Sequence, residues 1–182
     1  MRAVELVFAL GWAAFWLYWI VAAFSAKRGR ARWSRELAIR AVIVVVAIIL
    51  ARLGAFRGHA VATDPVRAAV GLILFAGGLT LAIWARVHLG RNWGLPMTRN
   101  DQPELVTSGP YRLVRHPIYT GILFGGIGTA VALDWVWLTV VALAGIYFVS
   151  SATVEERYLG EQFPGEYPAY RRSTRMLVPF VF

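Results

Sequence analysis

Long apolar runs separated by short basic gaps are the feature that most constrains how this chain folds. The runs occupy residues 3–24, 37–55, 66–89, 117–133 and 134–152. A bilayer core of about 30 Å needs about 20 helical residues to cross it, because each residue of an α-helix advances about 1.5 Å. The first and third runs reach that length easily. The pattern predicts an all-α, polytopic membrane protein with about five transmembrane helices.

The fourth and fifth runs form one apolar stretch that is too long for a single span. Asp134 interrupts this stretch near its middle. We therefore expect the last two helices to form a tight hairpin that turns at about 133–135, with each arm close to the minimum length for crossing the bilayer.

Composition supports a membrane protein and excludes several functions. The chain is 58% hydrophobic and 16% charged, and it has no cysteine, which excludes disulfides, thiolate metal sites and cysteine nucleophiles. No Gly-rich phosphate loop or zinc-ligand spacing is present, so we predict no metal site. The formal charge of +9 comes from arginines between the apolar runs, which is typical of membrane topology rather than of nucleic-acid binding.

The distribution of these basic residues predicts the orientation of the chain. They gather in the gap after the first run, in the segment after the third run and in the tail, at Lys27, Arg28, Arg30, Arg32, Arg35, Arg86, Arg91, Arg99, Arg112, Arg115, Arg157, Arg171, Arg172 and Arg175. The opposite side has only Arg2, Arg52, Arg57 and Arg67. Because positive residues favour the cytoplasm, we expect an outer amino terminus and a cytoplasmic carboxyl terminus. Residues 1–182 are predicted to form one membrane domain.

The hairpin geometry predicts a polar site at the cytoplasmic boundary. The fifth helix returns to the depth at which the fourth began, so Glu155 and Glu156 should lie beside Arg115 and His116. Pro117 suits the first turn of a helix, whose unpaired amides attract an anion. Two tyrosines add aromatic faces that attract a cation, and the glutamates accept hydrogen bonds from an ammonium group or a ribose hydroxyl. S-adenosylmethionine offers all these groups, although ordinary interfacial belt residues would give the same pattern.

Three segments together resemble the isoprenylcysteine carboxyl methyltransferase family and the wider membrane methyltransferases, which include phospholipid methyltransferases. They are ELVTSGPYRLVRHPIYTG (104–121), EERYLGEQFPGEYPAYRR (155–172) and MLVP (176–179). The resemblance covers about 85–180. It implies a cofactor-binding methyltransferase core at 85–182, preceded by amino-terminal helices at 1–84, and S-adenosylmethionine as the cofactor.

The resemblance also implies roles for individual residues. The cofactor-binding positions are Glu104, Leu105, Val106, Tyr111, His116, Pro117, Ile118, Tyr119 and Glu155. Arg115 and Glu156 are the candidate catalytic residues, and Tyr167 and Tyr170 match further family positions. Members that methylate prenylcysteine carry an arginine four residues before the returning glutamate, whereas this chain has Ser151 there. A carboxylate acceptor therefore loses its expected anchor.

The favoured hypothesis is an integral membrane S-adenosylmethionine-dependent methyltransferase that acts on a small or lipophilic acceptor. Alternatives are a phospholipid amine or a hydrophobic thiol as acceptor, or a non-methylating reductase-like or interaction protein of the same fold. Gly121, Gly125 and Thr129 lie four residues apart on the fourth run. That stripe predicts either close helix packing or a slot through which a lipid-like acceptor enters from the bilayer.

Overall fold

The computed structural model describes residues 2–23, 29–30, 64–90, 99–100 and 104–179. Within these residues, three helices are long and apolar enough to cross a membrane: α1 (Arg2–Ala23), α3 (Pro65–Leu89) and α5 (Trp137–Gln162). A shorter apolar helix, α4 (Pro117–Ala132), lies between α3 and α5 in the chain. The predicted all-α membrane protein is therefore confirmed, and the predicted second helix at 37–55 lies outside the described residues.

Smaller elements connect these helices. The 3-10 helix η2 (Gly109–Arg112) precedes α4, and the short helix α6 (Tyr167–Ser173) follows α5. Two strands of two residues each, β1 (Gly29–Arg30) and β2 (Arg99–Asn100), pair antiparallel with Gly29 opposite Asn100. The sequence did not predict this ladder, because two residues carry no strand periodicity.

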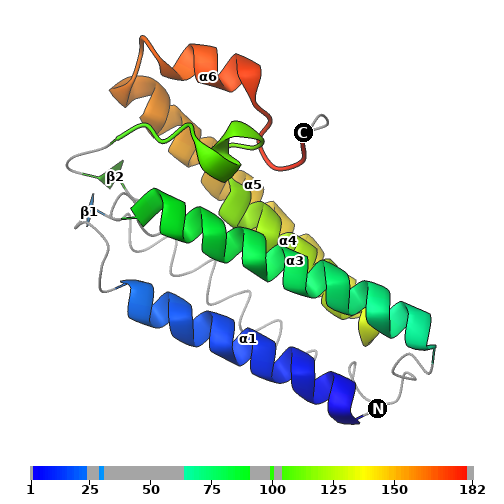
Figure 1. The fold of residues 1–182 in the computed structure, drawn as a ribbon. Helices are drawn as coiled ribbons and strands as arrows, with labels where there is room; N and C mark the ends of the chain where they lie inside the picture. The colour runs from blue at the N-terminus through cyan, green and yellow to red at the C-terminus, as the bar shows by residue number, and fades with distance from the viewer. Residues whose placement is uncertain (1, 24–28, 31–63, 91–98, 101–103, 180–182) are drawn as a thin grey trace.

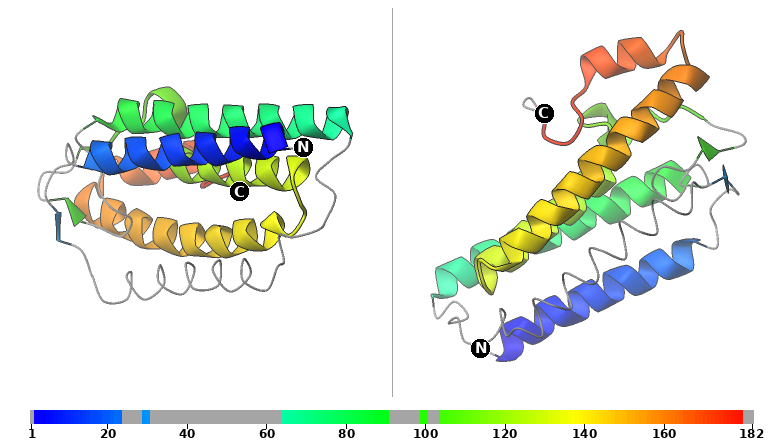
Figure 2. Two further views of the ribbon diagram at one scale, coloured as in Figure 1. Left: turned by 90° about the horizontal axis from the view of Figure 1, so that it is seen from below. Right: turned by 180° about the vertical axis from the view of Figure 1, so that it is seen from behind.

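One end of the bundle collects most of the polar segments, and we name it the site end. Helices α1, α3 and α5 finish there, α4 begins there, and α6 lies across it, while the amino terminus lies at the opposite end (Figure 1). Figure 2 shows the same arrangement from below and from behind. At the site end, the buried Arg86 of α3 donates to the carbonyl oxygens of Ala22 (2.8 Å) and Gly90 (2.7 Å), so one guanidinium joins the ends of α1 and α3.

Helices α3 and α4 pack with their backbones in direct contact. A Cβ atom placed on Gly78 of α3 would lie 2.5 Å from the carbonyl oxygen of Gly121 and 2.5 Å from the amide nitrogen of Gly125. Likewise, a Cβ on Gly71 would lie 2.6 Å from the carbonyl oxygen of Gly128. Small residues permit such close approach between membrane helices, where dispersion contacts drive association. The contact fixes the position of α4 against α3.

The glycine stripe of α4 is filled by neighbouring helices. Gly121 faces α3, and a Cβ on Gly125 would lie 3.2 Å from Leu79 and 3.4 Å from the ring of Trp12 on α1. The hydroxyl of Thr129 accepts a hydrogen bond from the Trp12 indole (3.1 Å) and donates to the carbonyl of Gly125 (2.9 Å). The interpretation as a slot for a lipid acceptor is therefore wrong, and the stripe is a packing surface.

The predicted hairpin is present. Helix α4 ends at Ala132 and α5 begins at Trp137, and in the turn Asp134 accepts the amide N–H of Val136 on its side chain (2.8 Å) and that of Trp137 on its carbonyl (3.1 Å). Helix α5 then continues to Gln162, well past the end of the apolar run at 152. The extension is charged but rich in strong helix formers, so the helix continues beyond the apolar residues.

We expect Gly78→Ala to lower the stability of the protein by about 1–3 kcal/mol, because the added methyl group meets backbone atoms that cannot move aside. At the adjacent Gly77, no atom of residues 2–23, 29–30, 64–90, 99–100 and 104–179 lies within 4 Å of an added Cβ, so Gly77→Ala should be neutral or stabilising by up to about 1 kcal/mol. Thermal unfolding of both variants in the same detergent measures the difference. Equal midpoints would contradict the packing described here.

Candidate functional site

An ion pair joins the start of α4 to α5 at the site end. The Nε atom of Arg115 donates to Oε1 of Glu156 at 2.7 Å, and both side chains are buried, with exposed fractions of 8% and 6%. The guanidinium of Arg115 also donates to the carbonyl oxygens of Thr174 (2.7 Å) and Arg171 (3.3 Å). Arg115 therefore links α5 to the carboxyl-terminal tail as well as to its own segment.

His116 lies between the two glutamates. Its Nδ1 atom is 3.5 Å from Oε2 of Glu155, and its Nε2 atom is 3.4 Å from Oε1 of Glu156. The hydroxyl of Tyr119, one turn further along α4, donates to Oε1 of Glu155 at 2.5 Å. The predicted convergence of Arg115 and His116 with Glu155 and Glu156 is confirmed. We call His116, Tyr119 and these two glutamates, with Arg115, the carboxylate cluster.

Aromatic rings line one side of the carboxylate cluster. The His116 and Tyr119 rings stack with their centroids 5.4 Å apart and their planes 4° apart, and Tyr119 stacks on Phe148 of α5 at 4.5 Å and 9°. Ile118 belongs to the same apolar core, while Pro117 is buried as the first residue of α4. Phe148 was missed by the sequence analysis, although it shares a helix face with Ser151 and Glu155, which follow it at spacings of three and seven residues.

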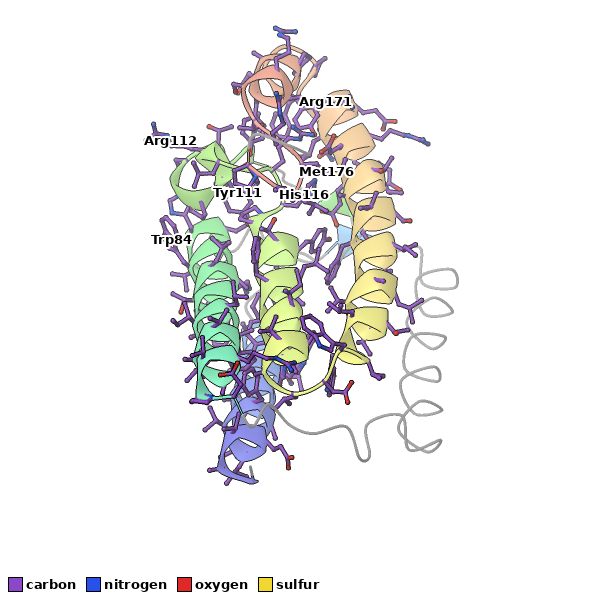
Figure 3. The ribbon with its side chains drawn as sticks, turned by 90° about the vertical axis from the view of Figure 1, so that its right-hand side faces the viewer. Trp84, Tyr111, Arg112, His116, Arg171 and Met176 are labelled. Atoms are coloured by element: carbon purple, nitrogen blue, oxygen red, sulfur yellow. The ribbon has the colours of Figure 1, made fainter. Side chains whose placement is uncertain are left out.

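The carboxyl-terminal tail runs beside the segment that leads into α4. The amide N–H groups of Arg115 and His116 donate to the carbonyl oxygens of Arg175 (2.8 Å) and Met176 (3.1 Å). The hydroxyl of Thr120 donates to the carbonyl oxygen of Leu177 at 2.6 Å. These bonds occupy the two amides that precede α4, and the expectation that the first-turn amides of α4 attract an anion stays a prediction. Figure 3 shows His116 and Met176 close together at this end of the bundle.

The remaining predicted cofactor residues lie near the apolar core that contains Ile118 and Tyr119. Tyr111 is buried, its hydroxyl donates weakly to the carbonyl of Ala85 on α3 (3.4 Å), and burial raises the pKa of its phenol. Val106 packs against the apolar core that contains Tyr111 and Tyr119. Leu105 is half-buried and Glu104 is exposed. Tyr111 and Val106 thus share one apolar core. The roles of all the predicted site residues stay predictions.

The tail braces Tyr111 as well. The hydroxyl of Tyr170 on α6 donates to the carbonyl oxygen of Tyr111 at 2.8 Å. An open cavity lies nearby, between the end of α5 and α6, with a volume of about 540 Å³ and with Glu156 in its wall. Glu156 therefore belongs both to the carboxylate cluster and to the wall of this cavity.

The electrostatics of the carboxylate cluster favour a charged imidazole. Burial by itself would lower the pKa of His116, but the adjacent carboxylates of Glu155 and Glu156 outweigh burial and hold that pKa above its ordinary value. A protonated His116 balances one of the two buried carboxylates, and Arg115 balances the other.

Protonated His116 should make the protein more stable at mildly acidic pH. A raised folded-state pKa contributes stability that is fully present below the unfolded value of about 6.5 and is lost as the pH rises through the folded value. We therefore expect the thermal midpoint of the ligand-free protein to fall between about pH 6 and pH 9, and to fall less in His116→Gln. His88→Gln, outside the carboxylate cluster, should keep the wild-type dependence. Identical pH profiles for His116→Gln and the wild type would contradict this assignment.

The family model described as phospholipid methyltransferase matches residues 66–166, more than half of the chain. This region contains all of α3 except its first residue, all of α4 and all five residues of the carboxylate cluster. Similar curated proteins include the probable protein-S-isoprenylcysteine O-methyltransferase of Oryza sativa subsp. indica, 33% identical over 116 residues, which are 62% of this chain and 61% of that protein. Protein-S-isoprenylcysteine O-methyltransferase B of Arabidopsis thaliana is 32% identical over 116 residues, 61% of this chain and 58% of that protein.

A relative with a different name covers more of the chain. The cobalt-zinc-cadmium resistance protein CzcN of Cupriavidus metallidurans is 33% identical over 141 residues, 75% of this chain and 61% of that protein. The matches thus span about three fifths of the length of these relatives. With a family model over more than half of its residues, this chain belongs to the phospholipid methyltransferase family.

Proposed function

We propose that this protein is an integral membrane methyltransferase that uses S-adenosylmethionine to methylate a small or lipophilic acceptor. The observation that carries the proposal is the carboxylate cluster, in which the start of α4 meets two glutamates of α5 inside the family-matched region. Arg115 and His116 balance the carboxylates of this cluster, and aromatic rings flank it. A charged, nucleoside-containing cofactor needs this combination of groups.

The residues present fit S-adenosylmethionine. Glu155 is a quarter exposed, whereas Glu156 is nearly fully buried, so Glu155 is the more accessible acceptor for an ammonium group or a ribose hydroxyl. Tyr119 and His116 fix the position of the Glu155 carboxylate from the α4 side. We assign Glu155, His116, Pro117, Ile118 and Tyr119 to the methionine side of the cofactor.

The adenosine side is assigned to the segment before α4. Tyr111 and Val106 share the apolar core with Tyr119, and Glu104 and Leu105 precede them in the chain. Apolar walls with a few fixed polar groups are typical of cofactor sites. This assignment continues the sequence prediction for those four residues.

Bound S-adenosylmethionine would supply a methyl group on a positively charged sulfur for in-line transfer. The task of this chain is to hold the two reactants in line and to exclude water, and good alignment contributes about 7–11 kcal/mol. The stacked rings of His116, Tyr119 and Phe148 bring aromatic groups to this region, and aromatic faces attract a cation that has lost its water shell.

Arg115 and Glu156 were predicted to be catalytic, and their contacts favour a positioning role. Arg115 uses its guanidinium on Glu156 and on two tail carbonyls, so it holds the tail and α5 together. Glu156 faces both Arg115 and His116. Of the two candidate general bases for a neutral amine or hydroxyl acceptor, Glu156 is the one that remains, because protonated His116 has no nitrogen lone pair left to accept a proton.

Ser151 supports an acceptor without a free carboxylate. It lies one helical turn before Glu155 and is fully buried, and within the described part of the chain its hydroxyl has no hydrogen-bond partner. Its neighbours Ser150 and Thr153 instead donate to the carbonyl oxygens four residues back, at 2.9 and 2.8 Å. A buried hydroxyl without a partner is unfavourable, so a bound acceptor group is its natural partner. We propose an amine of a phospholipid or a hydrophobic thiol as the acceptor.

The charge pattern supports placing this site in the cytoplasm. Arg112 and Arg115 before α4 and three arginines in the tail lie at the site end, which would then face the cytoplasm with the carboxyl terminus. The amino terminus, at the other end of the bundle, would lie outside.

Calorimetry separates this proposal from a reductase-like or purely structural role. Purified protein in detergent should bind S-adenosylmethionine, and NADPH should give no heat beyond dilution. Binding of NADPH alone, or of neither molecule, would refute the proposed function.

We expect Glu155→Ala to weaken binding of S-adenosylmethionine strongly while the protein stays folded, because the most accessible carboxylate of the cluster is lost. Losing a charge-assisted hydrogen bond costs about 1.5–3 kcal/mol, or roughly tenfold or more in affinity. Glu161→Ala, near the end of the same helix and outside the cluster, is the matched control. Circular dichroism checks folding, and unchanged affinity in Glu155→Ala would rule out this pocket.

Ser151→Arg should shift acceptor preference toward carboxylates. A guanidinium at this position can pair with a substrate carboxylate, as the family resemblance implies. We expect improved methylation of an S-prenylated cysteine relative to phosphatidylethanolamine or a long-chain thiol, measured by transfer of radiolabelled methyl groups. Ser150→Arg, on the exposed side of α5, should leave the ratio unchanged. Affinity for S-adenosylmethionine monitors folding, and its loss in Ser151→Arg alone would show that the position serves the cofactor instead.

A further inference from the structure

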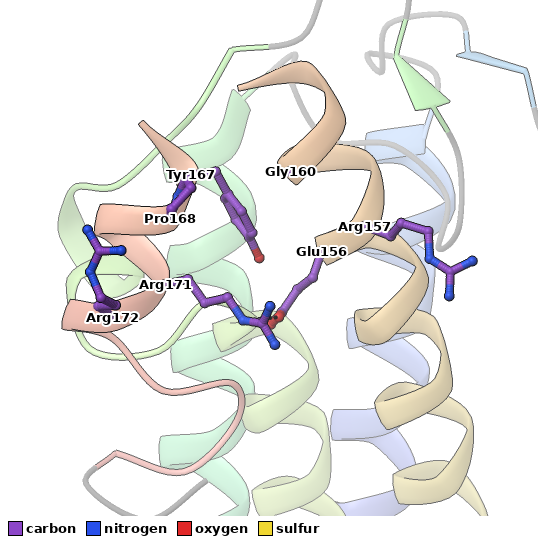
Figure 4. Close-up of a pocket in the computed structure, with 7 residues that line it drawn as sticks. All are labelled: Glu156, Arg157, Gly160, Tyr167, Pro168, Arg171 and Arg172. Carbon is purple, nitrogen blue, oxygen red and sulfur yellow. Dashed lines mark ion pairs between the residues drawn. The ribbon is translucent and has the colours of Figure 1, made fainter. Parts of the chain in front are cut away.

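A second polar site lies beyond the carboxylate cluster, in the cavity between the end of α5 and α6. Its volume of about 540 Å³ falls within the range of about 300–1,000 Å³ typical of small-molecule sites. Its lining comes from the charged end of α5 and from α6, and Figure 4 labels all of it: Glu156, Arg157, Gly160, Tyr167, Pro168, Arg171 and Arg172. The proposed function uses only Glu156 from this set.

The lining of the cavity has an excess of positive charge. The lining contains three arginines and one glutamate, and Glu156 is already neutralised by Arg115 at 2.7 Å. Arg171 approaches Glu156 only at 3.5 Å, and the Arg171 side chain is 63% exposed. The Arg171 guanidinium is therefore held weakly, and an incoming anion does not have to break a strong ion pair to bind it.

Tyr167 adds a buried donor to this cavity. It is only 3% exposed, and its hydroxyl has no hydrogen-bond partner among the residues that the structure describes. In contrast, the hydroxyl of Tyr170, one turn later on α6, donates to the carbonyl of Tyr111. Buried polar groups are nearly always paired, so an unpaired one in a cavity wall indicates a ligand. Figure 4 shows the Tyr167 ring pointing toward Arg171 and Glu156, while Arg157 extends away from α6.

We propose that this cavity binds a phosphate group, with the Tyr167 hydroxyl and the Arg171 guanidinium as its main donors and Arg172 as an additional positive charge. Arginine recognises phosphate through parallel N–H donors, and a tyrosine hydroxyl gives a further hydrogen bond without adding charge. The phosphate belongs either to a lipid headgroup or to a soluble phosphate. The cavity lies past the apolar part of α5, beside the charged end of that helix.

This phosphate site does not depend on methyl transfer, because its two donors lie outside the residues assigned to the cofactor. Binding of a phosphate ligand is therefore measured directly on the purified full-length protein, in neutral detergent and without S-adenosylmethionine. The probes are a short-chain phosphatidylglycerol, inorganic phosphate, and a short-chain diacylglycerol that lacks the phosphate. Thermophoresis at two salt concentrations gives an affinity for each probe.

Tyr167→Phe and Arg171→Gln should each weaken binding of the phosphatidylglycerol by about tenfold, because each removes a hydrogen bond to a charged group. Arg171→Gln should also reduce the salt dependence, whereas Tyr167→Phe should not. Tyr158→Phe and Arg112→Gln are the matched controls, since Tyr158 on α5 and the exposed Arg112 on η2 do not line the cavity. Both controls should bind as the wild type does.

The probes distinguish the two sources of phosphate. Tight binding of phosphatidylglycerol with weak binding of inorganic phosphate supports a lipid headgroup, and comparable binding of both supports a soluble phosphate ligand. Binding of diacylglycerol as tight as that of phosphatidylglycerol, no binding of either phosphate probe, or wild-type affinity in Tyr167→Phe and Arg171→Gln overturns the proposal. Tyr167→Phe removes only an unpaired hydroxyl, so its thermal midpoint should not fall and a loss of binding cannot be ascribed to unfolding.

Discussion

The backbone contact between α3 and α4 is the constraint on which the rest of this structure depends. Glycines on both helices allow carbonyl and amide groups to approach to distances at which a single methyl group would clash. Helix α4 therefore sits at a fixed depth against α3, and its first residue, Pro117, starts at a fixed height. The position of this helix start determines where Arg115, His116 and Tyr119 make their contacts, because these residues lie within one turn of it.

The carboxylate cluster is then fixed from three directions. The hairpin returns Glu155 and Glu156 on α5, the tail binds the amides of Arg115 and His116, and Phe148 stacks on Tyr119. Buried carboxylates are tolerated only when cations or hydrogen-bond donors offset their desolvation, and here Arg115 and His116 fulfil that requirement. The same partners that make the cluster stable also orient the carboxylate of Glu155, which is the more accessible of the two.

The carboxylate cluster and the cavity between α5 and α6 differ in charge, and Glu156 belongs to both. On one side, cations and carboxylates balance within a buried, aromatic-lined cluster that belongs to the family-matched region. On the other side, the open cavity against α6 has more arginines than glutamates and an unpaired tyrosine hydroxyl. A cofactor with both charges suits the first environment, and an anionic group suits the second. Because the cluster and the cavity share Glu156, the proposed cofactor and the proposed phosphate would lie next to each other.

The sequence by itself determined the apolar spans, the hairpin at Asp134 and the meeting of Arg115 and His116 with two glutamates, because helical rise and span length are local and regular quantities. It also indicated the family through its motifs. Only the tertiary structure decided that the stripe of Gly121 and Gly125 packs against neighbouring helices and that the tail occupies the amides before α4. Likewise, only the fold distinguishes Ser151 and Tyr167, with unpaired buried hydroxyls, from paired neighbours of similar chemistry. These outcomes depend on which distant segment reaches each side chain, and no local pattern encodes that.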